Sequence, residues 1–593
     1  MRESRSLSVL KVSGLSKSYE TQEILRDVSF VLNGGEKAGL VGPNGSGKST
    51  LLRLIAQHER PDTGSVWLDP GDTVGYLPQY PVEDLALTVH ESLLRGAGTA
   101  GVLKGRVAEL EQRMPRVCGE ELDRLLGEYA TAQAEFERLG GYDLDDRIAS
   151  VVRGLEIATR LDGPVGALSG GNKTKLGLAR LLLSGATVLL LDEPTNYLDL
   201  PALLWLERWV HESRAACVIV SHDRRFLDET VGEILQLDAQ KHTVRAWPGN
   251  YTAYADAQSR EEEKQLGRWL DQQARKKRIE EDIRRTKEQA RGVEMGTNLD
   301  TARRYAKKVA AKAKAREGRL ERDLARNEAE QPVRTWGLHL ADLGKGDIED
   351  NRTVLDVRGL HAEYPGLDVL LGVDLQVRGR DRLALLGANG SGKSTLLRCL
   401  TGMAEAEVRA AGDGLPASVG ADVRITSGVV RLGSGVRLGM LSQEAAELPQ
   451  DETVFDVFRA GTRMYEDEAR AYLHKFLFGE DEVRKRVASL SYGQRAKLAL
   501  ALLVLGEANF LVLDEPTSHM DMQAIEAIEV AIAEYTGPLL VVSHDRYFLD
   551  KIKITRTAVM EQGRLHGVEG IAEYESGLEA ELGRSGRAPG RPI

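Results

Sequence analysis

Short, uninterrupted apolar runs recur along the chain, and each one ends at a cluster of polar residues. Residues 188–191 and 511–513 are both followed by Asp-Glu-Pro-Thr, and residues 218–220 and 541–542 are both followed by Ser-His-Asp. Continuous apolar runs of this length are typical of parallel β-strands buried on both faces. The pattern therefore predicts an α/β fold with a buried parallel sheet in each half of the chain.

A different pattern lies between the two halves. Residues 258–291 are charged, favour helix and contain no proline, and a sparse apolar stripe recurs in them at near-helical spacing. Gly292 and Gly296 interrupt this pattern, and a second helix-favouring segment then runs to Gln331. We expect two long antiparallel helices with a tip near residues 291–299. At about 1.5 Å per residue, each helix would span roughly 50 Å.

Size and composition place limits on this picture. With 593 residues and a mass of 65.1 kDa, the chain is too long for a single hydrophobic core. The net charge of −11 argues against a protein that coats nucleic acid over its whole surface. Three widely separated cysteines lack metal-ligand spacing and suit a reducing compartment. Because we find neither an apolar signal core nor a membrane-length apolar run, we expect a cytoplasmic protein.

A glycine-rich loop of the form Gly-x-x-x-x-Gly-Lys-Ser/Thr occurs twice, within residues 42–50 and 387–395. Such loops direct backbone N–H groups at phosphate oxygens where a helix begins. One loop indicates a nucleotide, and two loops indicate a protein that holds two. The candidate ATP-binding residues are Gly42, Asn44, Gly45, Gly47, Lys48, Ser49 and Thr50 in the first copy and Gly387, Asn389, Gly390, Gly392, Lys393, Ser394 and Thr395 in the second.

Further motifs repeat with matched spacing. A tyrosine lies 29 residues before each loop lysine, the serine of a Leu-Ser-x-Gly motif lies 23 residues before each strand-end aspartate, and a histidine follows that aspartate by 30. Chance does not readily produce such a set twice. The residues concerned are Tyr19, Ser169, Asp192 and His222 in the first copy and Tyr364, Ser491, Asp514 and His544 in the second.

This set resembles the ATP-binding-cassette ATPase domain, over most of residues 6–255 and again over most of residues 351–570. The resemblance implies two P-loop cassette domains, each with a parallel-sheet core and an attached helical subdomain. It also implies an ATP hydrolase that uses Mg²⁺. Such phosphoryl transfer to water proceeds by positioning and electrostatic stabilisation.

The resemblance assigns a role to each motif. The loop lysines would neutralise the β- and γ-phosphates, and the tyrosines would stack on adenine, although a lone buried tyrosine is more often part of a core. The expected magnesium ligands are Ser49, Gln79, Asp192, Ser394, Gln443 and Asp514. The expected catalytic residues are Glu193 and Glu515, which orient and deprotonate water, His222 and His544, which bind the γ-phosphate, and Gln79 and Gln443, which sense it. A serine triad is excluded, because neighbours at one strand end point in different directions.

In this family the Leu-Ser-x-Gly motif caps the nucleotide held by the opposite domain. ATP would therefore favour the closed state, since only that state contacts it from both sides. Tyr492 and Asn172 depart from the family pattern, and whether the two sites hydrolyse equally stays open. The capping residues would be Ser491 and Gly493 for the site of Lys48, and Ser169 and Gly171 for the site of Lys393.

The charge of the linker is opposite to that of the rest of the chain. Residues 260–326 contain 21 Lys and Arg against 13 Asp and Glu, a net charge of +8, which leaves −19 elsewhere. A solvated coiled coil with ordinary ion pairs would explain this pattern, and so would an arm that contacts RNA phosphates. The contrast between the basic linker and the acidic remainder of the chain favours the RNA-contacting arm. The candidate RNA-binding residues are Arg284, Arg285, Arg291, Arg303, Arg304, Lys307 and Lys308.

Two fused cassettes, a basic helical linker and no membrane domain resemble the ABC-F family. The segments 249–254, 194–199 and 517–521 also look like that family. Its members bind the ribosomal tRNA exit site, and their linker tip reaches toward the peptidyl-tRNA and the peptidyl-transferase centre on the large subunit. Some regulate or rescue translation, and others displace ribosome-targeting antibiotics. The resemblance implies a monomer that binds ribosomes with ATP and leaves after hydrolysis, but the motifs do not choose among these tasks.

The expected organisation has four parts: cassette 1 at residues 1–255, the linker at 256–350, cassette 2 at 351–570 and a tail at 571–593, disordered from about 583. The first cassette has about 42 more residues between its glutamine and its Leu-Ser motif than the second has. They predict a helical arm at about 97–140 or an enlarged helical subdomain. An Ala/Gly-rich insert at 404–421 predicts a surface loop.

The rival hypothesis is an ATPase subunit that docks on separate membrane subunits of a transporter. It would need no long basic arm. A DNA-repair ATPase is a third possibility, but such proteins usually carry zinc-binding cysteines, whose spacing is absent from this sequence.

Overall fold

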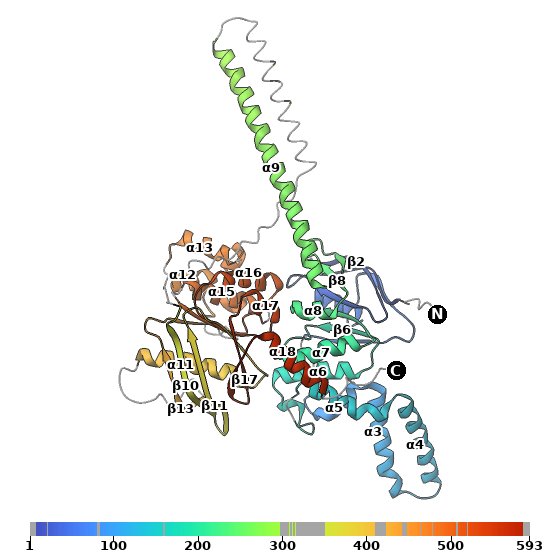
Figure 1. Ribbon diagram of the computed structural model, residues 1–593. Helices are drawn as coiled ribbons and strands as arrows, with labels where there is room; N and C mark the ends of the chain where they lie inside the picture. Colours follow the sequence, from blue (N-terminus) through green and yellow to red (C-terminus); the bar gives the residue numbers. More distant parts are fainter. Residues whose placement is uncertain are drawn as a thin grey trace. The chain divides into compact units, whose positions relative to one another are not determined.

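The computed structural model describes residues 8–20, 22–79, 84–157, 160–296, 308, 311, 315, 350–409, 423–441, 448–462, 464–476, 478–490, 492–505, 508–518 and 520–584. The chain forms two compact units. One contains residues 1–251 together with 336–593, and the other contains residues 252–335. The first unit holds both cassettes, each with its own sheets (Figure 1).

A six-stranded sheet lies at the centre of the first cassette. Its apolar runs are fully buried in β6 and β7, as the pattern of buried parallel strands predicts. Neighbouring strands from β5 to β8 are parallel, and β9 pairs antiparallel with β8. The strand order is β5 (Val74–Leu77), β6 (Val188–Asp192), β7 (Ala216–Val220), β3 (Lys37–Val41), β8 (Glu233–Leu237) and β9 (Val244–Pro248).

Helices connect these strands, and a group of them forms a helical insertion. Residues 97–140 contain α3 and α4, which pack on each other through Leu110, Leu125 and Ala132. The helices of this cassette are α1 (Lys48–Ile55), α2 (Val89–Gly96), α3 (Gly98–Arg113), α4 (Glu120–Arg138), α5 (Leu144–Gly154), α6 (Gly170–Leu183), α7 (Leu200–Glu212) and α8 (Arg224–Thr230).

The second cassette repeats this sheet. Its strand order is β14 (Leu438–Leu441), β15 (Phe510–Asp514), β16 (Leu539–Val542), β12 (Arg382–Leu386), β17 (Arg556–Glu561) and β18 (Arg564–Val568). Its helices are α11 (Lys393–Arg409), α12 (Val454–Thr462), α13 (Glu466–Lys475), α14 (Glu480–Val483), α15 (Tyr492–Leu505), α16 (Met522–Glu534), α17 (Arg546–Lys551) and α18 (Ile571–Arg584).

Each cassette also has a separate three-stranded antiparallel sheet. The first has the order β2 (Gln22–Asn33), β1 (Ser8–Tyr19) and β4 (Thr63–Leu68), and the second has the order β11 (Leu367–Arg378), β10 (Thr353–Tyr364) and β13 (Arg424–Leu432). The candidate tyrosines Tyr19 and Tyr364 are the last residues of β1 and β10.

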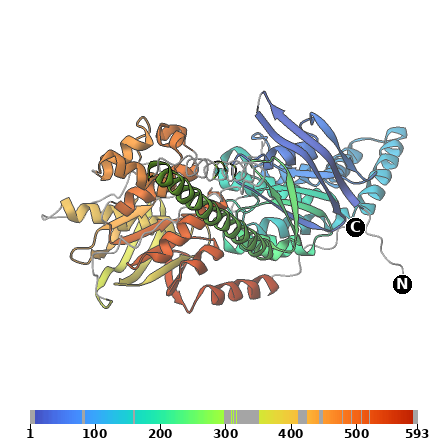
Figure 2. The ribbon, with the colours of Figure 1, turned by 90° about the horizontal axis from the view of Figure 1, so that it is seen from above.

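The linker unit is built on α9 (Tyr251–Gly296), a single helix of 46 residues that is uninterrupted in both ribbon views (Figure 1, Figure 2). The helix continues through Gly292 instead of breaking there, because a glycine inside a helix costs only about 1 kcal/mol. Residues 308, 311 and 315 are also helical. The expected tip beyond residue 296 lies outside the described residues.

Two expectations for the second cassette need correction. The predicted loop at 404–421 is helical at its start, because the Ala- and Glu-rich residues up to Arg409 continue α11; residues 410–421 lie outside the described part. The predicted tail at 571–593 instead begins with α18, which packs on α7 of the first cassette. Tyr574 anchors α18 in the same apolar cluster as Leu200 and Leu204 of α7.

Across the described residues, no helix has both the length and the apolar character required to cross a membrane.

Candidate functional site

Both glycine-rich loops connect the central strand of a sheet to the helix that follows it. Gly45 and Gly47 adopt positive φ angles of 79° and 106°, and Gly390 and Gly392 adopt 81° and 107°. A Cβ atom at Gly47 would lie 2.6 Å from the Cγ2 atom of Ile24. Only glycine accommodates this path without strain. The loops therefore have the backbone that turns successive N–H groups toward one point at the start of α1 and α11.

The loop lysines fold back over their own loops. Nζ of Lys48 donates to the carbonyl oxygens of Gly42 at 2.7 Å and Pro43 at 3.0 Å. Nζ of Lys393 donates in the same way to Gly387 at 2.7 Å and Ala388 at 2.9 Å. Burial lowers the pKa of both ammonium groups, while nearby carboxylates oppose this. An anion at either loop would stabilise the charged lysine.

A hydroxyl and a carboxyl group meet beside each loop. Asp192 is the last residue of β6 and lies near Ser49, and Asp514 ends β15 and lies near Ser394. Burial raises the pKa of both aspartates, and the nearby serine hydroxyl opposes this shift. Within the described residues, Oδ2 of Asp192 and Oδ1 of Asp514 are buried without a hydrogen-bond partner. Such unpaired hard oxygen donors fit Mg²⁺.

The next residue in each half has an unusual backbone. Glu193 and Glu515 have φ angles of 54° and 47°, in the left-handed region that non-glycine residues rarely adopt. Their N–H groups donate to the carbonyl oxygens of Val220 at 2.9 Å and Val542 at 2.8 Å, which fixes this conformation. Strained backbone of this kind clusters at functional sites. The same strain in both copies therefore supports a chemical role for the two glutamates.

Each glutamate faces the histidine of the same half. Nε2 of His222 lies 3.3 Å from Oε1 of Glu193, and Nε2 of His544 lies 3.5 Å from Oε1 of Glu515. Burial raises the pKa of each glutamate to about 8, with the loop lysine opposing the shift, and lowers the pKa of each histidine to about 3. The histidines are therefore neutral at physiological pH and can donate from one ring nitrogen.

Residues of both cassettes line one cavity of about 1270 Å³. The N–H of Asn389 in the second phosphate loop donates to Oδ2 of Asp199 at 2.7 Å, and its Nδ2 donates to the carbonyl oxygen of Tyr197 at 3.1 Å. The first Leu-Ser-x-Gly motif therefore shares a cavity with the second phosphate loop. Among the predicted residues, the lining includes Asn44, Gly45, Gly47, Lys48, Ser49, Thr50, Gln79, Ser169, Gly171, Asp192, Glu193, His222, Asn389, Gly390, Glu515 and His544.

Some predicted residues lie elsewhere or outside the described part. Tyr19 is 40% exposed and its hydroxyl donates to Glu59, and the hydroxyl of Tyr364 accepts from Arg398 at 3.4 Å. Gly493 is buried near the start of α15. Gln443 and Ser491 lie outside the described residues.

Only part of the predicted RNA-binding set can be placed. Arg284 and Arg285 lie on α9 with exposed side chains, and Arg284 is 3.7 Å from Glu288 one turn along the helix. Lys308 is exposed as well. Arg291 belongs to α9, but its side chain lies outside the described part, as do Arg303, Arg304 and Lys307.

Sequence reasoning missed four charged residues that connect the cassettes. Arg224 is paired with Glu529, and Arg546 is paired with Glu207. A signal for them was present, because both arginines follow a Ser-His-Asp motif directly and the glutamates occupy equivalent positions of the repeat.

Comparison with known proteins follows the same division of the chain. The model of the ABC transporter family matches residues 25–196 and 370–518. An ATP-binding protein of Bacillus subtilis, YdiF, is 34% identical over 96% of this chain and 82% of its own length. The energy-dependent translational throttle protein EttA of Haemophilus influenzae is 31% identical over 96% of this chain and 95% of its own. The tylosin resistance ATP-binding protein TlrC of Streptomyces fradiae is 34% identical over 92% of this chain and 96% of its own length.

A solved structure called RNase-L Inhibitor covers 96% of this chain and 93% of its own, with a TM-score of 0.59 and 19% identity. At this identity the likeness concerns the fold, which is the tandem-cassette arrangement.

Proposed function

The chain belongs to the ABC transporter family and, within it, to the ABC-F proteins with two cassettes on one chain, and from this premise we propose that it is a cytoplasmic, ribosome-associated ATPase. It hydrolyses ATP to ADP and phosphate. The names of two relatives support an action in translation: EttA is called a translational throttle and TlrC a tylosin resistance protein. The rival role, a subunit docking on membrane partners, gains no support from these relatives.

The residues of each site would divide the work of hydrolysis. Lys48 and Lys393, with the loop N–H groups, would bind the β- and γ-phosphates, since an anion is the missing partner of a buried ammonium group. Mg²⁺, held by the serine and aspartate oxygens beside each loop and by the glutamines, would supply positive charge to the phosphate oxygens. Tyr19 and Tyr364 would lie against adenine. The remaining binding residues would be those of the two loops given above.

The strand-end glutamates are the best candidates for the groups that orient water and accept its proton. Burial raises the pKa of Glu193 and Glu515 while the loop lysine opposes the shift, and the ionised form of such a carboxyl group is a stronger base than that of an exposed glutamate. His222 and His544, neutral and 3.3–3.5 Å from these carboxylates, would donate to the γ-phosphate. Ser169 and Gly171 would cap the nucleotide of Lys393, and Ser491 and Gly493 that of Lys48.

The observation that carries this proposal is the contact between Asn389 and Asp199. It joins the phosphate loop of one cassette to the loop that follows the catalytic carboxylates of the other. A nucleotide bound there is contacted from both cassettes, so ATP stabilises the joined state by its differential affinity. Because one chain supplies both halves of each site, we infer that a monomer suffices.

On the ribosome, the joined state would occupy the tRNA exit site, and the basic linker would contact ribosomal RNA and the peptidyl-tRNA. The exposed arginines of α9 support this role, since phosphate contacts are made by Lys and Arg. Hydrolysis would separate the cassettes and release the protein.

A trapping experiment tests the proposal. The double variant Glu193→Gln, Glu515→Gln keeps the shape of both side chains but removes the proton acceptors, so it should bind ATP without turning it over. In a lysate with ATP, it should sediment with ribosomes and block translation, whereas the wild type should cycle off. If the variant sediments free of ribosomes, or with membranes instead, the proposed function is wrong.

A further inference from the structure

Two arginines connect the cassettes through buried ion pairs that hydrolysis, as described above, does not use. Arg224 is the first residue of α8, two positions after His222, and Arg546 is the first residue of α17, two positions after His544. Each reaches a glutamate of the opposite cassette. Arg224 contacts Glu529 in the middle of α16, and Arg546 contacts Glu207 in the middle of α7.

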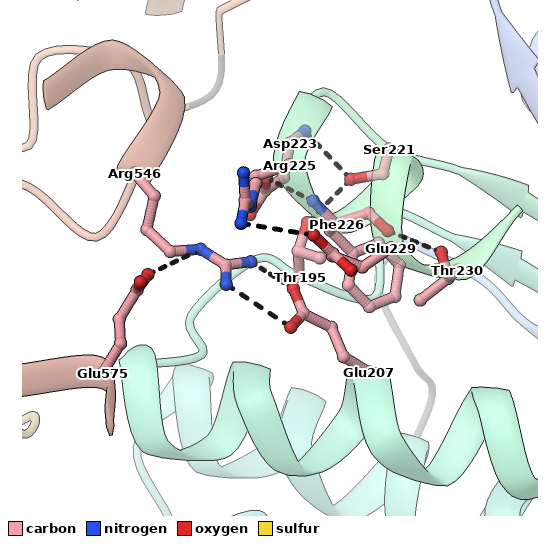
Figure 3. A network of polar contacts seen from close by, with 10 residues as sticks. All are labelled: Thr195, Glu207, Ser221, Asp223, Arg225, Phe226, Glu229, Thr230, Arg546 and Glu575. Atoms are coloured by element: carbon pink, nitrogen blue, oxygen red, sulfur yellow. Dashed lines mark hydrogen bonds and ion pairs between the residues drawn. The ribbon is translucent and has the colours of Figure 1, made fainter. Parts of the chain in front are cut away.

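Both contacts are two-pronged. One guanidinium nitrogen of Arg224 donates to Oε2 of Glu529 at 3.1 Å, and the other donates to Oε1. Arg546 donates to Oε2 of Glu207 at 3.4 Å and, with its other nitrogen, to Oε1 (Figure 3). Paired forks of this kind fix orientation as well as distance. The two arginines are 322 positions apart in the sequence, and so are the two glutamates. The two contacts are therefore equivalent under the internal repeat.

These pairs are deeply buried, with side-chain exposures of 2% and 8% for Arg224 and Glu529 and of 6% and 11% for Arg546 and Glu207. A buried ion pair is weak evidence for stability, because desolvation of the two charges offsets most of their attraction. The more distinctive effect of such a pair is that it fixes the orientation and the distance of the two side chains.

The geometry extends from each arginine to the catalytic groups. Asp223 lies between His222 and Arg224; its N–H donates to the hydroxyl of Ser221 at 3.0 Å, and its carboxylate accepts from the N–H of Phe226 at 2.9 Å (Figure 3). The second cassette repeats both bonds around Asp545, at 3.1 Å and 2.9 Å. The histidine and the arginine therefore lie on one hydrogen-bonded turn, which couples the position of one to that of the other.

Helix α7 shows why this matters for the site of Lys393. At its N-terminus Asp199 accepts from the N–H of Asn389, and further along the same helix Glu207 holds Arg546 beside His544. One rigid helix of the first cassette thus contacts both the phosphate loop and the histidine turn of the second. Additional contacts brace the arginines: Nε of Arg546 lies 3.6 Å from Glu575, and the guanidinium of Arg224 lies 4.0 Å from the ring centre of Tyr547.

We propose that Arg224 and Arg546 are positioning residues. Each fixes the position of the histidine in its own ATP site by binding a helix of the opposite cassette, so that turnover requires the cassettes to be joined. This rests on the proposed ATPase function, but Arg224 and Arg546 are not among the residues that line the cavity.

The test is a double-mutant cycle on the purified full-length chain with ATP alone, without ribosomes. Arg224→Ala and Glu529→Ala should each lower kcat by about ten- to a hundredfold while KM for ATP changes by less than about threefold, as expected when remote positioning is lost. The double variant should be no worse than either single variant, because both remove one contact. Arg225→Ala is the matched control, since Arg225 is half-exposed, makes no two-pronged contact with Glu529 among the described residues, and lies 3.3 Å from Glu229 on its own helix.

A second variant separates positioning from folding. The apolar pair Arg224→Met with Glu529→Leu removes both charges together and should restore the unfolding temperature toward that of the wild type. We expect its kcat to stay low. If kcat recovers with the unfolding temperature, or if the single variants turn over ATP normally, Arg224 is not a positioning residue. An inactive wild-type chain would instead contradict the proposed function itself, so the two failures are distinguishable.

Discussion

The backbone N–H of Asn389 donates a 2.7 Å hydrogen bond to Oδ2 of Asp199, a residue 190 positions earlier in the chain. Asp199 is fully buried, and its other oxygen lies 3.9 Å from the ammonium group of Lys175. Although burial opposes the charged form, Lys175 and the N–H of Asn389 lower the pKa of Asp199. Its counterpart Asp521 accepts from the N–H of Ala524 at the start of its own helix. Asp199 makes no such bond within α7 and serves the opposite cassette.

The first prediction concerns this contact. Asp199→Ala removes the acceptor of the Asn389 N–H and leaves Lys175 without its ion-pair partner. We expect ATP turnover by the isolated chain to fall about tenfold, because the second phosphate loop loses the hydrogen bond that positions it against the first cassette. Asp199→Asn is the matched control, since its amide oxygen still accepts the N–H, and it should retain at least a third of the activity. Wild-type turnover in Asp199→Ala would contradict the role of this contact.

A second prediction concerns pH and the Glu207–Arg546 pair. Burial raises the pKa of Glu207 to about 7; Arg546 opposes this shift, and Asp223 and Glu229 add to it. The unfolded chain releases this proton near the ordinary value of 4.5. Between these two values the folded state binds more protons than the unfolded state, so its stability decreases as the pH rises.

Glu207 is therefore expected to add roughly 1–3 kcal/mol to the free energy of unfolding below pH 4.5. This stabilisation is lost as the pH rises to about 7. Glu207→Gln cannot titrate. Its free energy of unfolding, measured by denaturant at intervals from pH 5 to pH 8, should therefore decline less steeply with pH than that of the wild type. Parallel curves for the two proteins would show that Glu207 does not titrate in this range.

The sequence predicted those features of the fold and the site that depend on neighbouring residues in the chain. The fully buried strands β6, β7 and β15 are continuous apolar runs, so pattern and spacing located both the parallel strands and the groups at their ends. The antiparallel sheets were missed. In β1 the register slips between Val12 and Leu15, where Gly14 has a positive φ, and this breaks the alternation that marks a half-buried strand.

Contacts between distant parts carry no local signal at all. Helix α18 looked like a tail because its apolar residues make sense only against α7 of the first cassette. No local pattern in the sequence singled out Arg224 or Arg546. The equivalent positions of Glu207 and Glu529 in the repeat could have indicated partners for them, but the resemblance that placed the cassettes face to face did not say which side chains meet.

A third prediction uses the phosphate loop. Gly47→Ala would place a methyl group 2.6 Å from Cγ2 of Ile24 in a residue with φ of 106°. Both effects disfavour the loop, so ATP should bind that site at least about tenfold more weakly, as measured by nucleotide titration. Gly105→Ala in α3 is the control, because nothing lies within 4 Å of the added carbon and alanine favours the helix. Equal binding by the two variants would show that the loop tolerates a different path.

The last prediction concerns the linker. Arg284 has a side chain that is 77% exposed, and Arg285 beside it is exposed as well, so neither supports a folded core. If they contact ribosomal RNA, the double variant Arg284→Ala, Arg285→Ala should bind ribosomes more weakly and should reduce the slope of log K against log salt by about 1–2, since each phosphate contact contributes about 0.7–0.9. ATP turnover without ribosomes should not change. Arg208→Ala is the control, because this half-exposed arginine of α7 pairs with Glu212 and belongs to a cassette. An unchanged slope would assign the two arginines to a solvated helix face with no RNA contact.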